Sequence, residues 1–256
     1  MRDCFQVDII TEEIITFIRE WFDKNGKDCN AVVGISGGKD STVVAALCAK
    51  ALGRDRVIGV MMPNRIQDDI DDSKKVCEVL GIKQFTVDIG DAYDGLIKSV
   101  IKGTSLDKLS DQTLINAAPR IRMATLYAVS QSMNGRVINT CNLSETLLSW
   151  ETRWGDAVGD VAPIVRLTVE EVKAIGHYLK LPKELVDKIP SDGLCGASDE
   201  EKMGIKYKDA DNYIRRNIVD DDIKAKIDER VNAYEFKRNP IPYYDPELPM
   251  YVGKKD

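Results

Sequence analysis

The stretch Val32-Val33-Gly34-Ile35-Ser36-Gly37-Gly38-Lys39-Asp40-Ser41 decides the fold, because an apolar strand passes through a turn of small residues directly into a helical pattern. Glycines at positions 34, 37 and 38 let the backbone approach an anion closely. The start of the following helix offers unpaired N–H groups and the positive end of the helix dipole. The stretch therefore predicts a loop that binds phosphate.

Counting residues excludes two common nucleotide-binding motifs. A Walker loop that used Lys39 would need a glycine at position 33 and a hydroxyl residue at position 40, where Val33 and Asp40 stand. The dinucleotide motif G-x-G-x-x-G also fails, since Ser36 occupies the place of the second glycine if Gly34 is the first.

The pattern that remains, S-G-G-x-D-S, resembles the loop of the ATP pyrophosphatases, which cleave ATP between the α and β phosphates. The resemblance implies an ATP site made by Gly34, Ser36, Gly37, Gly38, Lys39, Asp40 and Ser41. Ser36 and Ser41 can donate hydroxyl hydrogen bonds to phosphate. Asp40 would repel phosphate unless a cation intervened, which favours a metal ion such as Mg²⁺. The plainer alternative is an ordinary glycine-rich turn between a strand and a helix.

The composition describes a chain with one large core. It has 256 residues, of which 43% are hydrophobic and 30% charged, and we predict a single domain over residues 1–256 without a glutaminase domain. A net charge of -6 without a long Lys/Arg block argues against a nucleic-acid partner. Six scattered cysteines without a C-x-x-C pair suit reduced thiols in a cytoplasmic protein. Without an apolar run of membrane length, we expect no membrane span.

Strand patterns alternate with helical patterns along the first half of the chain, after an amphipathic helix at residues 7–24. We expect strands at 31–35, 56–62, 84–89 and 136–140, and helices at 41–52, 69–80, 91–102 and 112–133. Segments 141–167 and 188–200 are predicted loops, followed by helices at about 208–217 and 221–235 and a proline-rich, non-helical tail from Pro240. This order predicts an α/β fold with a Rossmann-like parallel sheet and helices on both faces. Ligands of such sheets bind beyond the carboxyl ends of the strands, where Ser36 and Thr140 stand.

Later segments resemble one group of ATP pyrophosphatases, the ammonia-dependent NAD⁺ synthetases, which have the adenine nucleotide alpha hydrolase fold. Residues 116–123, Asn-Ala-Ala-Pro-Arg-Ile-Arg-Met, followed by Tyr127, are similar to the N-x-x-x-R-x-R-M-x-x-x-Y helix of this family. The resemblance implies that Arg120 binds the substrate deamido-NAD⁺. An arginine on a solvated helix face is the alternative interpretation.

Residues 139–145, Asn-Thr-Cys-Asn-Leu-Ser-Glu, resemble the G-T-G-N-x-S-E turn of the same family. The resemblance implies that Thr140 contacts ATP and that Glu145 joins Asp40 as a ligand of Mg²⁺; it also places Met62, after the second strand, in the ATP site. A carboxylate at position 145 would otherwise serve the start of a helix. This chain departs from the pattern at both glycines, which Asn139 and Cys141 replace.

Residues 149–160, Ser-Trp-Glu-Thr-Arg-Trp-Gly-Asp-Ala-Val-Gly-Asp, align with the family pattern G-Y-F-T-K-Y-G-D-G-G-A-D. The implied deamido-NAD⁺ contacts are Trp150, Thr152, Arg153 and Asp160, with Trp150 or Trp154 stacking on the pyridine ring. Asp160 is also a candidate catalytic group, since it or Asp192 could accept the proton that ammonium must lose. Many members have a phosphate-contacting lysine where this chain has Val169, so that contact has no counterpart here.

Two C-terminal segments complete the resemblance. Residues 188–200 resemble the family's flap over the site, which implies that Ser191 contacts ATP. Phe236-Lys237-Arg238 resembles the terminal H-K-R, with Phe236 in place of the histidine. We expect Phe236 and Lys237 at the deamido-NAD⁺ site, with Lys237 supplying a catalytic charge to the adenylated intermediate. His177, the only histidine, has no partner suggested by the sequence, and the expected reaction needs no histidine base.

The resemblance implies an enzyme that uses ATP, with Mg²⁺, to amidate deamido-NAD⁺ with ammonia, releasing AMP and pyrophosphate. It also implies a homodimer. The nearest alternatives are a GMP-synthetase-like amidase and a tRNA thiolase, and residues 139–160 argue against both. An alternative of a different class is a non-catalytic adenine-nucleotide sensor that keeps the fold.

Overall fold

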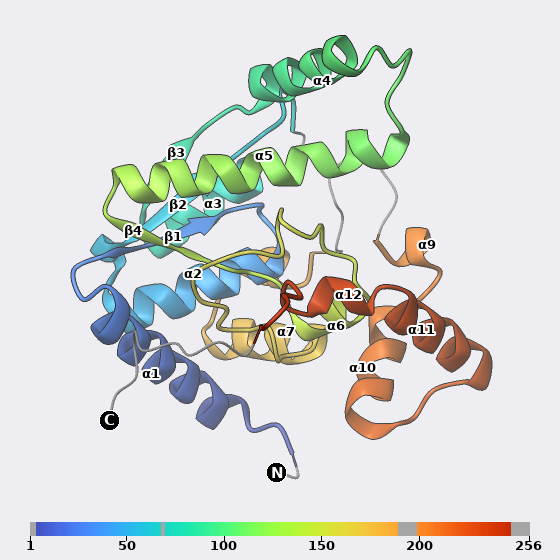
Figure 1. The fold of residues 1–256 in the computed structure, drawn as a ribbon. Helices are drawn as coiled ribbons and strands as arrows, with labels where there is room; N and C mark the ends of the chain where they lie inside the picture. The colour runs from blue at the N-terminus through green and yellow to red at the C-terminus, as the bar shows by residue number, and fades with distance from the viewer. Residues whose placement is uncertain (1–3, 68–69, 189–198, 247–256) are drawn as a thin grey trace.

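The computed structural model describes residues 4–67, 70–188 and 199–246. Its centre is a parallel sheet in the order β3-β2-β1-β4, formed by β1 (Asn30–Gly34), β2 (Val57–Met61), β3 (Lys83–Thr86) and β4 (Gly135–Ile138) (Figure 1). The central strands are apolar along their length because helices cover the sheet on both faces. The predicted fold class is therefore confirmed.

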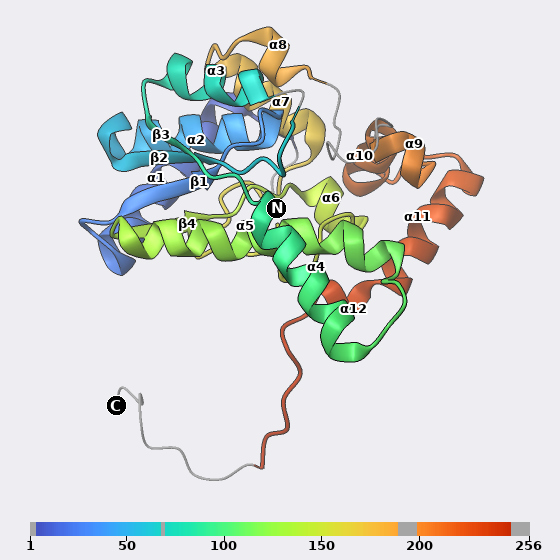
Figure 2. The same cartoon turned by 90° about the horizontal axis from the view of Figure 1, so that it is seen from above.

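Helices pack on the two faces in separate groups (Figures 1 and 2). One face carries α1 (Val7–Asn25), α2 (Lys39–Leu52), α3 (Ile70–Leu80), α7 (Val169–Tyr178) and α8 (Lys183–Val186). The other face carries α4 (Gly90–Thr104) and α5 (Asp111–Ser132). Each predicted helix of the first half is present, with bounds shifted by no more than a few residues.

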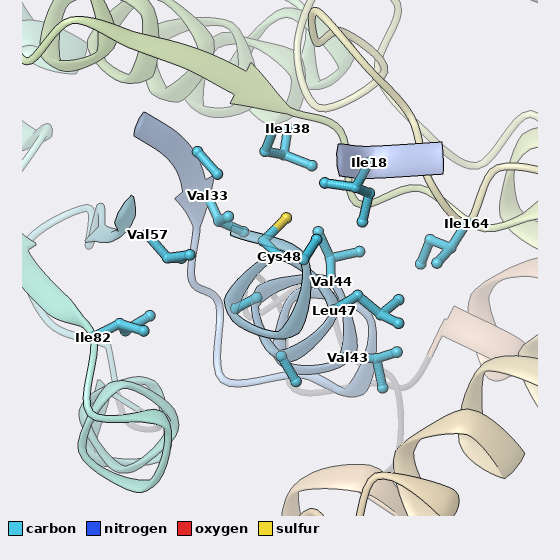
Figure 3. Close-up of a cluster of buried hydrophobic side chains, with 14 of the residues drawn as sticks. Ile18, Val33, Val43, Val44, Leu47, Cys48, Val57, Ile82, Ile138 and Ile164 are labelled. Atoms are coloured by element: carbon cyan, nitrogen blue, oxygen red, sulfur yellow. The ribbon is translucent and has the colours of Figure 1, made fainter. Parts of the chain in front are cut away.

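The alternation of side chains along the strands divides the core between these two layers. Val33 packs in one cluster with Leu47 of α2 and Ile18 of α1 (Figure 3). Its neighbour Val32 faces the opposite layer and belongs to the cluster that contains Leu126 of α5. Each fully buried side chain of this size contributes about 1.5–3 kcal/mol of hydrophobic free energy. The larger cluster holds α2 rigidly, and α2 is the helix that follows the phosphate loop.

The C-terminal part forms a smaller helical layer beside the sheet (Figure 1). It contains α6 (Leu143–Leu147), α9 (Asp199–Met203), α10 (Tyr207–Arg216), α11 (Asp221–Ala233) and α12 (Glu235–Arg238). Its own apolar cluster consists of Leu148, Val169, Ile205, Tyr207, Ala210 and Ile227. α10 and α11 were predicted; α6, α8, α9, α12 and the 3₁₀ turn Arg54–Arg56 were not, because so few turns carry no readable helical period. Residues 240–246 form no element, as predicted for the tail.

Other expectations concern the cysteines, the membrane and the histidine. In the described residues Cys4, Cys29, Cys48, Cys77 and Cys141 are free thiols. None of the helices in the described ranges combines the length and apolar character that a membrane span requires. The sequence suggests no partner for His177, and the structure provides one, since Nε2 of His177 lies 3.0 Å from Oδ1 of Asp187 in an exposed pair.

Candidate active site

The carboxyl ends of β1 and β4 meet where the strand order changes direction. From β1 the chain proceeds through α2 to β2 on one side, while β4 pairs with β1 on the other side, with Val33 in register with Ile138. Such a switch point leaves a crevice beyond the strand ends. The segments that follow the two strands, residues 35–41 and 139–145, therefore lie beside one another.

The loop after β1 has the backbone that its glycines predict. Gly37 has φ +79°, and a Cβ atom there would lie 2.9 Å from the backbone nitrogen of Ser73 in α3. Both facts require glycine at this position. Gly38 is the residue before the first turn of α2, and the hydroxyls of Ser36 and Ser41 lie 3.2 Å apart across the loop. The predicted ATP-binding segment thus forms a tight turn at the N-terminus of a 14-residue helix.

A buried lysine lies between two carboxylates at this crevice. Nζ of Lys39 is 2.8 Å from Oδ2 of Asp40 and 3.9 Å from Oε1 of Glu145. Only 3% of the Lys39 surface is exposed, and its ammonium group also lies 5.9 Å from the centre of the Tyr207 ring. The structure therefore brings together Lys39, Asp40 and Glu145, three residues of the predicted ATP and metal site.

Asn142 links the two strand ends. Its Nδ2 donates to Oδ1 of Asp40 at 3.0 Å, and its Oδ1 accepts the backbone N–H of Glu145 at 3.0 Å. The second bond is half of a capping box that starts α6, in which the Glu145 side chain accepts the backbone N–H of Asn142. Asn142 thus contacts both carboxylates, that of Asp40 through its side-chain amide and that of Glu145 through its backbone N–H.

The charges of the site shift one another's pKa values. Burial, together with the charge of Asp40, raises the pKa of Glu145 to about 8, although Lys39 opposes the shift. Burial alone would lower the pKa of Lys39, but the charges of Asp40 and Glu145 and the hydrogen bond to Asp40 outweigh it and raise that pKa. One lysine neutralises only part of the negative charge of two carboxylates, so this pair can bind a cation.

The donor set fits Mg²⁺ in particular. In the described residues no cluster of three or more His, Cys, Asp or Glu side chains could hold a metal by itself. Mg²⁺ commonly takes one or two carboxylates and completes its shell with phosphate oxygens and water. Asp40 and Glu145, placed beside a phosphate loop, have this composition.

The segment 149–160 packs tightly on α5. A Cβ atom on Gly155 would lie 2.9 Å from Cβ of Pro119, so the loop approaches α5 as closely as a glycine permits. Oγ1 of Thr152 donates to Oδ1 of Asn116 at 3.0 Å, and Nε of Arg120 donates to the carbonyl of Arg153 at 3.4 Å. The structure thus joins Arg120, Thr152 and Arg153 of the predicted deamido-NAD⁺ site.

Aromatic and cationic side chains alternate on the outer side of this segment. The guanidinium group of Arg153 lies 4.9 Å from the ring centre of Trp154 and 5.5 Å from that of Phe236. Trp150 is instead covered by Arg230 of α11 at 5.5 Å. Trp154 and Phe236 are 47% and 57% exposed. Of the two tryptophans, Trp154 is therefore the one on which the aromatic ring of a ligand could stack.

Asp160 is bound at the edge of the sheet. Its Oδ2 accepts the backbone N–H of Val137 at 2.7 Å, and its Oδ1 accepts from the hydroxyl of Tyr127 at 3.4 Å. The next residue, Val161, forms an isolated parallel bridge with Ile138. These contacts give Asp160 a role in fixing the end of the loop, and its catalytic role stays a prediction.

Lys237 lies against the loop from the C-terminal side. Its Nζ donates to the carbonyls of Ser149 and Glu151 at 2.8 and 2.7 Å, and burial lowers its pKa while the charge of Glu151 opposes that shift. The neighbouring Arg238 donates to Oγ of Ser149 at 2.8 Å. The role of Lys237 as a catalytic charge beside the adenylated intermediate stays a prediction. In this structure its ammonium group binds backbone carbonyls of the segment 149–160.

The remaining predicted residues have different positions. Met62 follows β2, its carbonyl accepts from Nε of Arg122 at 2.9 Å, and its methyl group lies near Gly34. Thr140 is half-buried at the end of β4. Ser191 and Asp192 lie outside the described residues. Val169 is buried in the apolar cluster of the C-terminal layer, so its side chain offers no polar contact.

The sequence reasoning missed three residues that shape the site. Asn142 was quoted only as part of a turn pattern, and its position directly before a helix start with a Glu three residues later is a readable capping signal. Tyr207 follows the flap segment in register with the family pattern, but that match assigns it no role at the site. Glu151 was aligned with a phenylalanine of the family pattern, and that substitution of an acid for an aromatic residue could have drawn attention to it.

Comparisons with known proteins identify the family of the chain. A family model described as NAD synthase matches residues 10–240. The NH(3)-dependent NAD(+) synthetase of Pyrococcus furiosus is 36% identical over 86% of this chain and 83% of its own length. Among solved structures, the NMN synthetase of Francisella tularensis has a TM-score of 0.85 at 30% identity, covering 96% of this chain and all of its own. The NH3-dependent NAD synthetase of Campylobacter jejuni has a TM-score of 0.76 at 29% identity, covering 94% of this chain and all of its own. The chain therefore belongs to the NAD synthase family.

Proposed function

We propose that the chain catalyses the ATP-dependent amidation of deamido-NAD⁺ by ammonia to NAD⁺. The observation that carries this proposal is the meeting of Lys39, Asp40 and Glu145 beside a phosphate loop, with the segment 149–160 fixed on α5 next to it. The family membership and the relatives named as NH(3)-dependent NAD(+) synthetases support the same reaction.

In the first step the nicotinate carboxylate of deamido-NAD⁺ attacks the α-phosphorus of ATP, and pyrophosphate leaves with the electron pair of the broken P–O bond. The nucleophile is ionised at neutral pH and needs no base. Catalysis therefore consists of aligning the two substrates and neutralising charge on pyrophosphate. The N–H groups at the start of α2 and the ammonium group of Lys39 are positioned for that task.

Asp40 and Glu145 would hold Mg²⁺, which when bound supplies further neutralisation of phosphate charge. In the second step ammonia attacks the carbonyl carbon of the adenylate, AMP leaves, and the amide of NAD⁺ remains. Arg120, Thr152 and Arg153 orient the nicotinate end of the acceptor, and Trp154 offers it an exposed ring.

A shorter acceptor, nicotinate mononucleotide, is a second candidate. The solved NMN synthetase of Francisella tularensis has a higher TM-score to this chain, 0.85, than the solved NAD synthetase of Campylobacter jejuni, 0.76. Both acceptors carry the same carboxylate, so one chemistry serves them. They differ only in whether an adenylate half must also be bound.

The test offers each acceptor separately with ATP, Mg²⁺ and ammonium, and identifies products by mass spectrometry. We expect NAD⁺, AMP and pyrophosphate in equal amounts from deamido-NAD⁺, with a kcat/KM at least tenfold above that for nicotinate mononucleotide. A reversed preference would assign the second function, and no pyrophosphate with either acceptor would refute both. Glutamine in place of ammonium should give no product, because the relatives that support the proposal are named as NH(3)-dependent NAD(+) synthetases.

We further propose a cytoplasmic homodimer. The free thiols of the described cysteines support a reducing compartment, and exposed apolar side chains such as Ile9 and Phe17 on α1 support self-association. Light scattering coupled to size-exclusion chromatography tests the dimer, with a single 28.6 kDa species as the contradicting result.

A further inference from the structure

Glu151 is a buried carboxylate with an unused acceptor. Only 5% of the residue is exposed, and its Oε2 accepts no hydrogen bond. Burying a carboxylate oxygen without a donor costs free energy, so such a group calls for a ligand that it receives during function. The family pattern quoted for residues 149–160 has phenylalanine at this position. A buried phenylalanine side chain has no polar atom, so it would not carry this cost in free energy.

Glu151 lines a cavity of about 190 Å³. The cavity is also lined by Asn139, Cys141 and Thr146 from the β4–α6 region, by Gly159, and by Lys237 and Arg238 from α12. This volume exceeds the roughly 30 Å³ that one water molecule occupies in the liquid. The cavity therefore has room for a small molecule beside Glu151.

The donors around the cavity are directed elsewhere. Nδ2 of Asn139 donates to the carbonyls of Asp156 and Val158, both at 3.1 Å. Lys237 directs Nζ at the backbone carbonyls of Ser149 and Glu151, not at the Glu151 carboxylate. Arg238 directs its guanidinium group at the carbonyls of Leu147 and Val231 and at Oγ of Ser149. A ligand for Glu151 must therefore bring its own N–H donors, be small, and carry no negative charge, since the carboxylate would repel an anion.

Ammonium meets all three requirements, and the reaction consumes its conjugate base. We propose that Glu151 binds the incoming ammonium ion and accepts one of its protons. This inference rests on the proposed function and adds a catalytic residue to it.

The step balances as follows. The N–H bond of ammonium breaks, its proton passes to a carboxylate oxygen of Glu151, and the electron pair stays on nitrogen. Ammonia then attacks the carbonyl carbon of the adenylate, and the bond from that carbon to the phosphate oxygen breaks with AMP as the leaving group. The protonated amide loses its extra proton to solvent, and Glu151 returns its own proton to water in the cavity.

The electrostatics of the cavity agree with this role. Burial raises the pKa of Glu151 to about 7, while the charges of Lys237 and Arg238 lower it and that of Asp156 raises it. A carboxylate that titrates near neutral pH can both take up a proton and release it.

The two half-reactions allow a decisive experiment. Adenylation is followed without ammonium, as exchange of labelled pyrophosphate into ATP in the presence of the acceptor, and amidation is followed as kcat/KM for ammonium. In Glu151→Gln we expect unchanged exchange and a fall of about 100-fold in kcat/KM for ammonium. Glu151→Asp should recover part of the rate. Glu151→Phe, which introduces the residue of the family pattern, should fold and behave like Glu151→Gln.

The pH profile separates proton transfer from a structural effect. Without an acceptor the variant depends on free ammonia, so between pH 6 and 8 its rate should rise about tenfold per pH unit, more steeply than in the wild type. Unchanged ammonium kinetics in Glu151→Gln, or equal losses of exchange and amidation in both Glu151→Gln and Glu151→Phe, would overturn the proposal. Absence of exchange in the wild type would instead refute the proposed function.

Discussion

Lys39 and Glu145 approach each other to 3.9 Å from opposite sides of the switch point, Lys39 from the helix after β1 and Glu145 from the helix after β4. Asp40 lies on the same ammonium group at 2.8 Å. In the described residues Lys39 is therefore the cationic side chain that lies within 4 Å of both carboxylates. Removing the charge of Lys39 should therefore affect the protein without Mg²⁺ and the protein with Mg²⁺ bound in different ways.

We predict that Lys39→Met lowers the free energy of unfolding by about 2 kcal/mol without Mg²⁺, because two partly buried carboxylates lose their counter-charge. Mg²⁺ should restore part of that loss, since it supplies positive charge at the same oxygens. Urea denaturation with and without Mg²⁺ measures both effects. Lys50→Met, an exposed lysine of the same helix, is the matched control, and an equal loss in both variants would contradict the prediction.

Asp40→Asn should reduce kcat at least about 100-fold, because the amide keeps the shape of the side chain but loses its affinity for Mg²⁺. The free energy of unfolding should also fall, because Lys39 loses the charge of its partner at 2.8 Å, although the amide oxygen still accepts from Asn142. Release of pyrophosphate at saturating ATP is the measurement. Asp55→Asn removes a carboxylate that is 98% exposed and should leave kcat unchanged. Full activity of Asp40→Asn would show that the metal role is wrong.

Gly155→Ala should raise KM for the nicotinate acceptor about tenfold or more and leave KM for ATP nearly unchanged. The added methyl group would lie 2.9 Å from Pro119, so the segment 149–160 must move away from α5. Initial rates over both substrates distinguish the two constants. Gly95→Ala in α4 meets no atom within 4 Å and should stabilise the protein by about 0.5–1 kcal/mol, which provides the control. Equal changes in both KM values would argue against a local displacement.

The stability of the protein should depend on pH through Glu151. Burial raises its pKa in the folded state to about 7, above the ordinary value of 4.5, so the folded state holds the proton more tightly and stability falls as the pH rises between these values. Glu151→Gln removes this titrating group. The variant should match the wild type near pH 4.5 and exceed its free energy of unfolding by up to about 3 kcal/mol at pH 8. Denaturation at both values is the measurement, and a difference that does not grow with pH would refute the assignment.

Much of the fold could be predicted because its elements are long and periodic. The strand at β1 and the helix at α2 carry strong apolar patterns on either side of a glycine turn, and the alternation of strands and helices fixes a parallel sheet. Short elements could not be predicted. α6 and α12 span only 5 and 4 residues, and their formation depends on the capping side chain of Asn142 and on the contacts of Lys237 with the loop.

The described residues of the predicted site lie on the segments after β1, β2 and β4 and on α5 and α12, and their orientations required the structure. Sequence patterns place Asp160 in the substrate loop, whereas its carboxylate accepts the N–H of Val137 at the sheet edge. They contain Glu151 only as one position of the aligned segment 149–160. Whether an acidic side chain is solvated or buried depends on packing between segments far apart in the chain. A local sequence pattern does not show which of these segments pack together.

Asn142 couples the position of Asp40 to that of Glu145. Its amide holds Asp40 through nitrogen and the first turn of α6 through oxygen, and the two partners leave the amide one orientation only, since a backbone N–H cannot bond to the nitrogen side. A displacement of the phosphate loop is thus passed directly to α6, and from there to the substrate segment that follows it. Binding of ATP on one side of the crevice can in this way shift the segment that holds the nicotinate end of the acceptor, through a single pair of hydrogen bonds.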